Sequence, residues 1–111
     1  MSTDFAQIFN QLIEQVTTLA KNTVKDYTDA AVTDGKQFLQ ESQEKLQRWT
    51  TLLANHQLTT QDFTWLVQSQ KDLAQMEALK QAGLAMARID AFKASMLTLI
   101  IDTVFSILKV A

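Results

Sequence analysis

The sequence predicts an all-α protein: a long antiparallel hairpin of two helices, completed into a bundle by other copies of the chain. Three observations predict this fold. The 111 residues contain no proline and only two glycines, so little interrupts a helix. A specific helix-start signal lies near the middle of the chain. Apolar residues recur every eleven positions on both sides of that signal, which is the spacing of an almost straight helix.

The first predicted helix covers residues 3–54, because no strong helix breaker occurs in that range. Gly35 is the candidate soft point, since glycine inside a helix costs about 1 kcal/mol relative to alanine. We expect a bend or fraying there at most. Residues 55–58 then form the turn of the hairpin.

The second predicted helix covers residues 59–110 and begins with a capping box. Thr59 can accept a hydrogen bond from the backbone of Asp62, and the Asp62 side chain can return one to Thr59. Leu58 and Phe63 flank this cap as a hydrophobic staple. Each helix of roughly 50 residues would be about 75 Å long at 1.5 Å per residue. The whole chain, residues 1–111, is expected to form one helical-hairpin domain.

The eleven-residue (hendecad) repeat predicts which residues form the seam between the two helices. If the chain folds back at residues 55–58, positions whose numbers add up to about 112 lie side by side, and large side chains in the middle face small ones. The apolar stripe of each helix could also pack against a helix of another chain, as in a domain-swapped coiled coil. The predicted seam consists of Phe5, Val16, Tyr27, Phe38, Trp49, Phe63, Ala74, Ala85, Met96 and Ile107.

Many apolar residues are left outside this seam, mostly at the end of the hairpin formed by residues 5–19 and 92–110. Two helices cannot bury them all between themselves, and helix two is apolar around most of its circumference there. An exposed apolar patch of this kind predicts association. The predicted oligomer interface consists of Ile8, Leu12, Phe92, Leu97, Ile101, Val104, Phe105 and Leu108.

Chemical motifs are scarce in this sequence. There is no cysteine and one histidine, His56, which lies in the predicted turn, so we expect no catalytic, cofactor-binding or metal-binding residues and no enzymatic function. The net charge of −2 is spread along the chain, which argues against nucleic-acid binding. Trp49, Trp65, Tyr27 and Phe38 lie at helical spacing, which predicts core packing.

The sequence leaves the compartment undecided. Asp4 and Glu14 stand where a Sec-type signal would carry basic residues. The apolar run at residues 94–108 contains Asp102 and is shorter than the about 20 residues that a spanning helix needs. We therefore expect neither a Sec signal nor a transmembrane segment. The cytoplasm is the default, and non-classical export stays open.

The favoured function is a non-enzymatic, self-assembling structural or interaction protein that forms a homo-oligomer or filament. One alternative is an amphipathic coat on a lipid or polymer surface, because the eleven-residue pattern is similar to that of apolipoproteins and granule-coating phasins. Another is a small exported hairpin, either a secretion substrate or a pore-former. The Trp-X-Gly secretion substrates resemble the chain in size and topology, but it contains no Trp-X-Gly. A different helical protein or a lipid surface also stays open as the partner.

Overall fold

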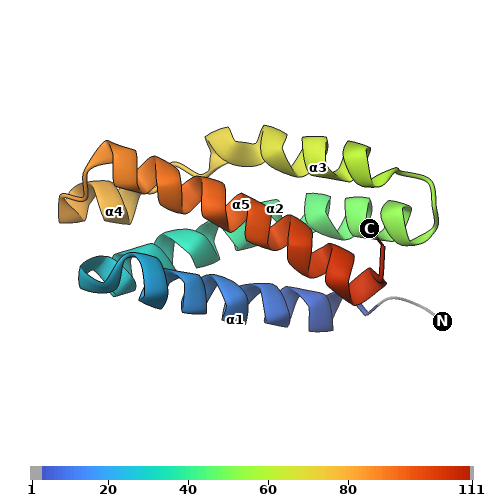
Figure 1. The fold of residues 1–111 in the computed structure, drawn as a ribbon, viewed down its shortest axis with the longest axis horizontal. Helices are drawn as coiled ribbons and strands as arrows, with labels where there is room; N and C mark the ends of the chain where they lie inside the picture. Colours follow the sequence, from blue (N-terminus) through green and yellow to red (C-terminus); the bar gives the residue numbers. More distant parts are fainter. Residues whose placement is uncertain (1–3, 111) are drawn as a thin grey trace.

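The computed structural model describes residues 4–110 and confirms the all-α prediction. Four antiparallel arms form a bundle, in which the third arm is interrupted (Figure 1). The predicted start of the first helix, at residue 3, lies outside the described residues. In chain order the elements are α1 (Phe5–Thr23), the 3₁₀ turn η1 (Lys25–Tyr27), α2 (Thr28–Ala54), α3 (Thr60–Gln68), the 3₁₀ turn η2 (Ser69–Leu73), α4 (Glu77–Ala82) and α5 (Met86–Leu108).

The predicted helix of residues 3–54 is divided in two, because the chain reverses direction after α1. The break falls in the stretch NTVKDYT at residues 22–28, where asparagine, threonine, valine, aspartate and tyrosine all have low helix propensity. The Thr23 hydroxyl donates to the Leu19 carbonyl at 2.6 Å, and the Thr28 hydroxyl donates to the Lys25 carbonyl at 2.9 Å. These local bonds give the backbone an alternative to a continuous helix.

Gly35, the expected soft point, lies inside the continuous helix α2. It is buried, and a Cβ atom at this position would overlap Cγ1 of Val16 in α1. The glycine therefore allows the backbone of α2 to approach α1 closely, and it does not interrupt the helix.

The turn between α2 and α3 agrees with the prediction. The backbone N–H of Asp62 donates to the Thr59 hydroxyl at 3.0 Å, and the N–H of Thr59 donates to the Asp62 carboxylate at 3.4 Å, which confirms the capping box. α2 ends in a Schellman-type cap: His56 has φ 60°, and the N–H of Gln57 donates to the Leu52 carbonyl at 2.8 Å.

The predicted helix of residues 59–110 is divided into α3, α4 and α5. α4 lies between two residues with left-handed backbone, Met76 with φ 58° and Gly83 with φ 93°. Gly83 ends α4 in a Schellman motif, in which the N–H of Leu84 donates to the Leu79 carbonyl at 3.2 Å. Leu79 and Leu84 are both buried, which supplies the hydrophobic contact that accompanies this motif.

The bundle is the predicted hairpin folded in half. Its extents are 44 × 23 × 22 Å, so the two rods of about 75 Å expected from 1.5 Å per residue do not form. α5 packs along α1, and the interrupted third arm packs along α2, which keeps the predicted antiparallel pairing. The fold adds contacts between α1 and α2 and between α3 and α5, and one apolar core fills the space between the arms.

Candidate association surface

Most of the predicted oligomer interface is buried within this chain. Six of its eight residues belong to the core: Ile8, Leu12, Phe92, Leu97, Ile101 and Val104. The interface was expected because two helices cannot cover these side chains, but in the folded chain four arms surround them. The surplus of apolar residues therefore gives no reason to expect a partner at these six positions. The other two, Phe105 and Leu108, are half-buried.

The predicted seam residues also divide between core and surface. Six are buried: Phe5, Val16, Phe38, Phe63, Ala74 and Met96. Tyr27, Trp49 and Ile107 are half-buried, and Ala85 is exposed. Tyr27 and Ala85 lie at the breaks before α2 and α5, where the chain leaves the helical repeat. The eleven-residue pattern thus marks six core positions of ten, and it is least reliable at the breaks between helices.

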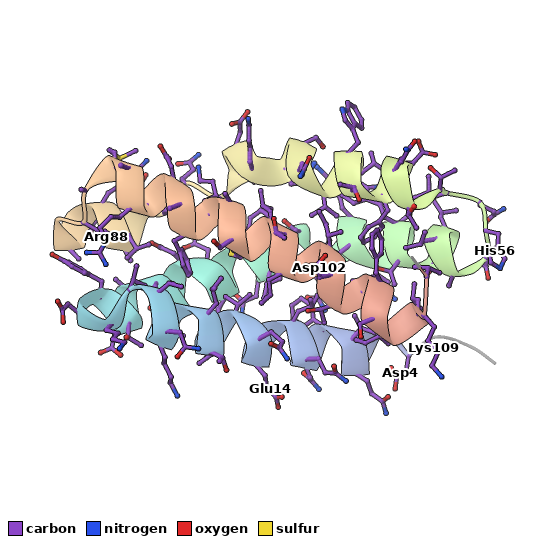
Figure 2. The ribbon with its side chains drawn as sticks, in the orientation of Figure 1. Asp4, Glu14, His56, Arg88, Asp102 and Lys109 are labelled. Carbon is purple, nitrogen blue, oxygen red and sulfur yellow. The ribbon has the colours of Figure 1, made fainter. Side chains whose placement is uncertain are left out.

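A large hollow with mainly apolar walls lies at the end of the bundle that carries Asp4 and Val110. We call it the terminal hollow; it has a volume of about 580 Å³. Half-buried apolar side chains at the end of α5 line it, together with polar side chains of α1 and of the turn after α2. Figure 2 shows Asp4, His56 and Lys109 at this same end of the molecule. The lining residues are Asp4, Gln7, Ile8, Gln11, Ala54, His56, Ile107, Leu108, Lys109 and Val110.

Helix caps on both sides fix the shape of the terminal hollow. Asp4 caps α1, since its carboxylate accepts a hydrogen bond from the N–H of Ala6 at 3.0 Å. At the other side α5 ends in a Schellman motif, with Lys109 at φ 58° and the N–H of Val110 donating to the Phe105 carbonyl at 3.0 Å. This motif turns the chain at the end of α5, so Leu108 and Val110 both line the hollow.

A second apolar feature lies on the side of the bundle, between α3 and α5. Trp65 is 69% exposed, which corrects the prediction that it packs in the core, and it lines a shallow hollow of about 240 Å³ with Phe105. The Phe105 ring lies 5.7 Å from the ring of the buried Phe63. Trp65 lies two positions along α3 from Phe63, so its side chain projects from the side of the helix opposite to Phe63.

His56, Arg88 and Asp102 are exposed and lie in different parts of the molecule, with His56 at the turn after α2 and Arg88 at the opposite end of the bundle (Figure 2). Arg88 donates to the carbonyl of Thr23 at 3.5 Å, at the carboxyl end of α1, where a cation is favourable. Among residues 4–110, no three histidine, aspartate or glutamate side chains are grouped to hold a metal ion.

Among residues 4–110, one titratable group is buried. Asp34 in α2 is 5% exposed, and its carboxylate accepts hydrogen bonds from the N–H groups of Ala78 at 3.0 Å and Leu79 at 2.8 Å. These N–H groups belong to the first turn of α4, so Asp34 caps that helix from a different arm. No local sequence pattern marks Asp34 as a cap, because the N–H group that its carboxylate accepts lies 44 residues away along the chain.

α5 has 23 residues and is longer than the apolar run at residues 94–108, from which no transmembrane segment is expected. By length and composition it is the one helix among the described residues that could cross a membrane, and 33% of its most apolar stretch is buried in the bundle. Core helices of water-soluble proteins meet the same criteria, so this is weak evidence for a membrane span.

Comparison of the chain with protein-family models, with the curated proteins and with the solved structures gave no match.

Proposed function

We propose that the chain is a non-enzymatic helical protein that associates with other copies of itself through the terminal hollow. One observation carries the proposal: Ile107, Leu108 and Val110 stay half-buried around an open hollow, while most other large apolar residues of α5 lie in the core. An apolar centre with a polar rim is the usual arrangement of an interface between proteins.

The rim charges favour a second copy of the chain as the partner. Asp4 and Lys109 carry opposite charges on the same rim. In a two-fold dimer every contact between the copies occurs twice, so a docking that places Asp4 against Lys109 of the other copy forms two such charge pairs. The surface is confined to one end of the bundle and is therefore small. We expect reversible association that depends on protein concentration.

The test is the mass of the protein in solution, measured by sedimentation velocity and light scattering at low and high concentration. The monomer has a mass of 12.5 kDa, and the proposal requires a larger mass at high concentration. A variant carrying Leu108→Asp and Val110→Asp places charge in the hollow and is expected to stay monomeric while keeping its helical circular dichroism.

The matched control is Ala87→Asp. Ala87 is exposed in the first turn of α5, where an acidic residue is compatible with the helix dipole, and it lies at the other end of α5 from the terminal hollow. This variant should associate like the parent protein. A parent protein that remains at 12.5 kDa at the highest concentration would rule the proposal out.

Binding to a lipid surface through α5 is the second candidate, supported by the length and apolar composition of that helix. It requires the bundle to open, because the most apolar side chains of α5 now face the core. Flotation with vesicles of neutral and anionic lipid separates the two candidates. A monomer that floats with vesicles favours the lipid surface, and an oligomer that stays with the soluble fraction favours self-association.

A further inference from the structure

α4 is a six-residue helix between two backbone positions of unusual conformation. Met76, just before it, has φ 58°, and Gly83, just after it, has φ 93°. Glycine adopts this left-handed conformation readily, whereas for methionine it costs free energy because of the Cβ atom. An isolated helix of this length is not stable in water, so contacts with the rest of the bundle must hold α4 in place.

Two kinds of contact hold α4 against the bundle. One is the buried Asp34 carboxylate, which accepts the N–H groups of Ala78 and Leu79; the neighbouring Met76 supplies no side-chain cap. The other is apolar, since Met76, Leu79 and Leu84 are buried and α4 packs mainly on α2. The segment thus depends on one polar anchor and a few apolar ones.

There is open space on one side of this attachment. A hollow of about 200 Å³ lies beside Asp34, between α2 and the chain that leads into α4. Its walls are Gln37, Phe38 and Glu41 of α2 and residues 73–77. Ala74 has φ −82° and ψ 78°, which ends the 3₁₀ turn before α4 begins, so the connection is irregular.

We propose that α4, residues 77–82, forms a strap that opens and closes on α2 as one unit, with Asp34 as its latch and with Met76 and Gly83, which flank it, as its hinges. Closure covers the apolar face of α2 under α4, and opening exposes that face together with Leu79. Segments that few buried contacts hold in place open at the lowest free-energy cost in folded proteins. This conformational device lies on α2, α4 and the start of α5, apart from the terminal hollow.

Hydrogen exchange of the whole chain, followed by mass spectrometry, tests the proposal. In the parent protein the amides of residues 77–84 are expected to exchange at least about tenfold faster than those in the middle of α2, as expected of a local opening. Asp34→Ala removes the latch and should speed exchange in residues 77–84 by a further factor of about ten, with little change in α1 and α3.

A second variant tests the hinge without touching the latch. A Cβ atom on Gly83 would meet no atom within 4 Å, so Gly83→Ala changes only the backbone preference at φ 93°. It too should speed exchange in residues 77–84 alone. Gln37→Ala, which alters the wall of the hollow without removing a bond to α4, is the control and should leave exchange unchanged.

Two results would overturn the proposal. One is equal acceleration in all helices of the Gly83→Ala variant, which would mean that the strap opens only when the whole protein unfolds. The other is unchanged exchange in residues 77–84 of the Asp34→Ala variant, which would mean that Asp34 does not hold the strap closed.

Discussion

Gly35 in α2 faces Val16 in α1 so closely that a Cβ atom on Gly35 would overlap Cγ1 of Val16. Val16 is 1% exposed and β-branched, so it has little freedom to turn away inside α1. The distance between the first two arms is therefore set by the absence of a side chain at position 35.

Gly35→Ala should lower the free energy of unfolding although alanine is the better helix former. Alanine would gain about 1 kcal/mol in helix propensity. The overlap with Val16 should cost about 1–3 kcal/mol of overpacking, which outweighs that gain. Urea unfolding measures the difference. In a Val16→Ala background the same substitution should become neutral or stabilising, and a Gly35→Ala variant more stable than the parent would contradict the close approach.

Thr50→Val should raise the stability of the bundle. The hydroxyl oxygens of Thr50 and Ser42 are buried and have no hydrogen-bond partner among the described residues. Valine has the same shape as threonine and removes the unpaired hydroxyl, so we expect a gain of about 1 kcal/mol in thermal or urea unfolding. Thr51→Val, at an exposed position on the same helix, is the control and should change stability by less than about 0.5 kcal/mol. A loss of stability in Thr50→Val would mean that its hydroxyl is paired in solution.

His56→Gly should also stabilise the protein, because His56 has φ 60° at the end of α2. A left-handed conformation costs a residue with a Cβ atom roughly 1–2 kcal/mol, and glycine avoids that cost, so a gain of about 1 kcal/mol is expected. Asn55→Gly is the comparison, since Asn55 has φ −91° and should gain nothing. Equal effects of the two substitutions would show that the backbone conformation of His56 is not the cause.

Asp4 and Lys109 provide a test of the proposed two-fold association. Lys109→Glu alone or Asp4→Lys alone should weaken self-association, because like charges would then face each other across the interface. A mixture of the two single variants should associate again as a mixed dimer, because both facing pairs then have opposite charges. Sedimentation of each variant and of the mixture measures this. A mixture no heavier than its components would exclude the charge pairing.

The sequence predicted those parts of the fold that depend on local chemistry. The capping box of Thr59 and Asp62 is a pattern within four residues, and the structure contains both of its hydrogen bonds. The antiparallel pairing of the two halves was predicted from the turn at residues 55–58 and from large side chains facing small ones. It is retained because α5 still packs along α1 and the third arm still packs along α2.

The breaks in the helices could not be recognised from glycine and proline alone. The reversal after α1 depends on several residues of low helix propensity around Val24, none of which is a strong breaker by itself. Gly83 ends a helix and Gly35 does not, and only the packing of the bundle distinguishes them. The radius of gyration is 13.9 Å, close to the about 13 Å that is usual for a compact domain of this length, and the prediction of two long rods gave chain length too little weight.

The candidate site, like the fold, was predicted only in part. The prediction that the residues near both ends of the chain are surplus depended on a two-armed fold, and the added arms buried most of them. The apolar surface that remains, around Leu108 and Val110, is a small part of the predicted region of residues 5–19 and 92–110. Trp65 was missed because helical spacing shows which residues share a face and not which face points to solvent.

The bond between Asp34 and the start of α4 joins residues 44 positions apart. A truncated peptide that begins after α2 lacks this carboxylate, and it would not contain the information that starts α4 at Glu77. We expect such fragments to have different helix boundaries from the whole protein, so dissecting the chain into peptides would give a misleading map of its secondary structure.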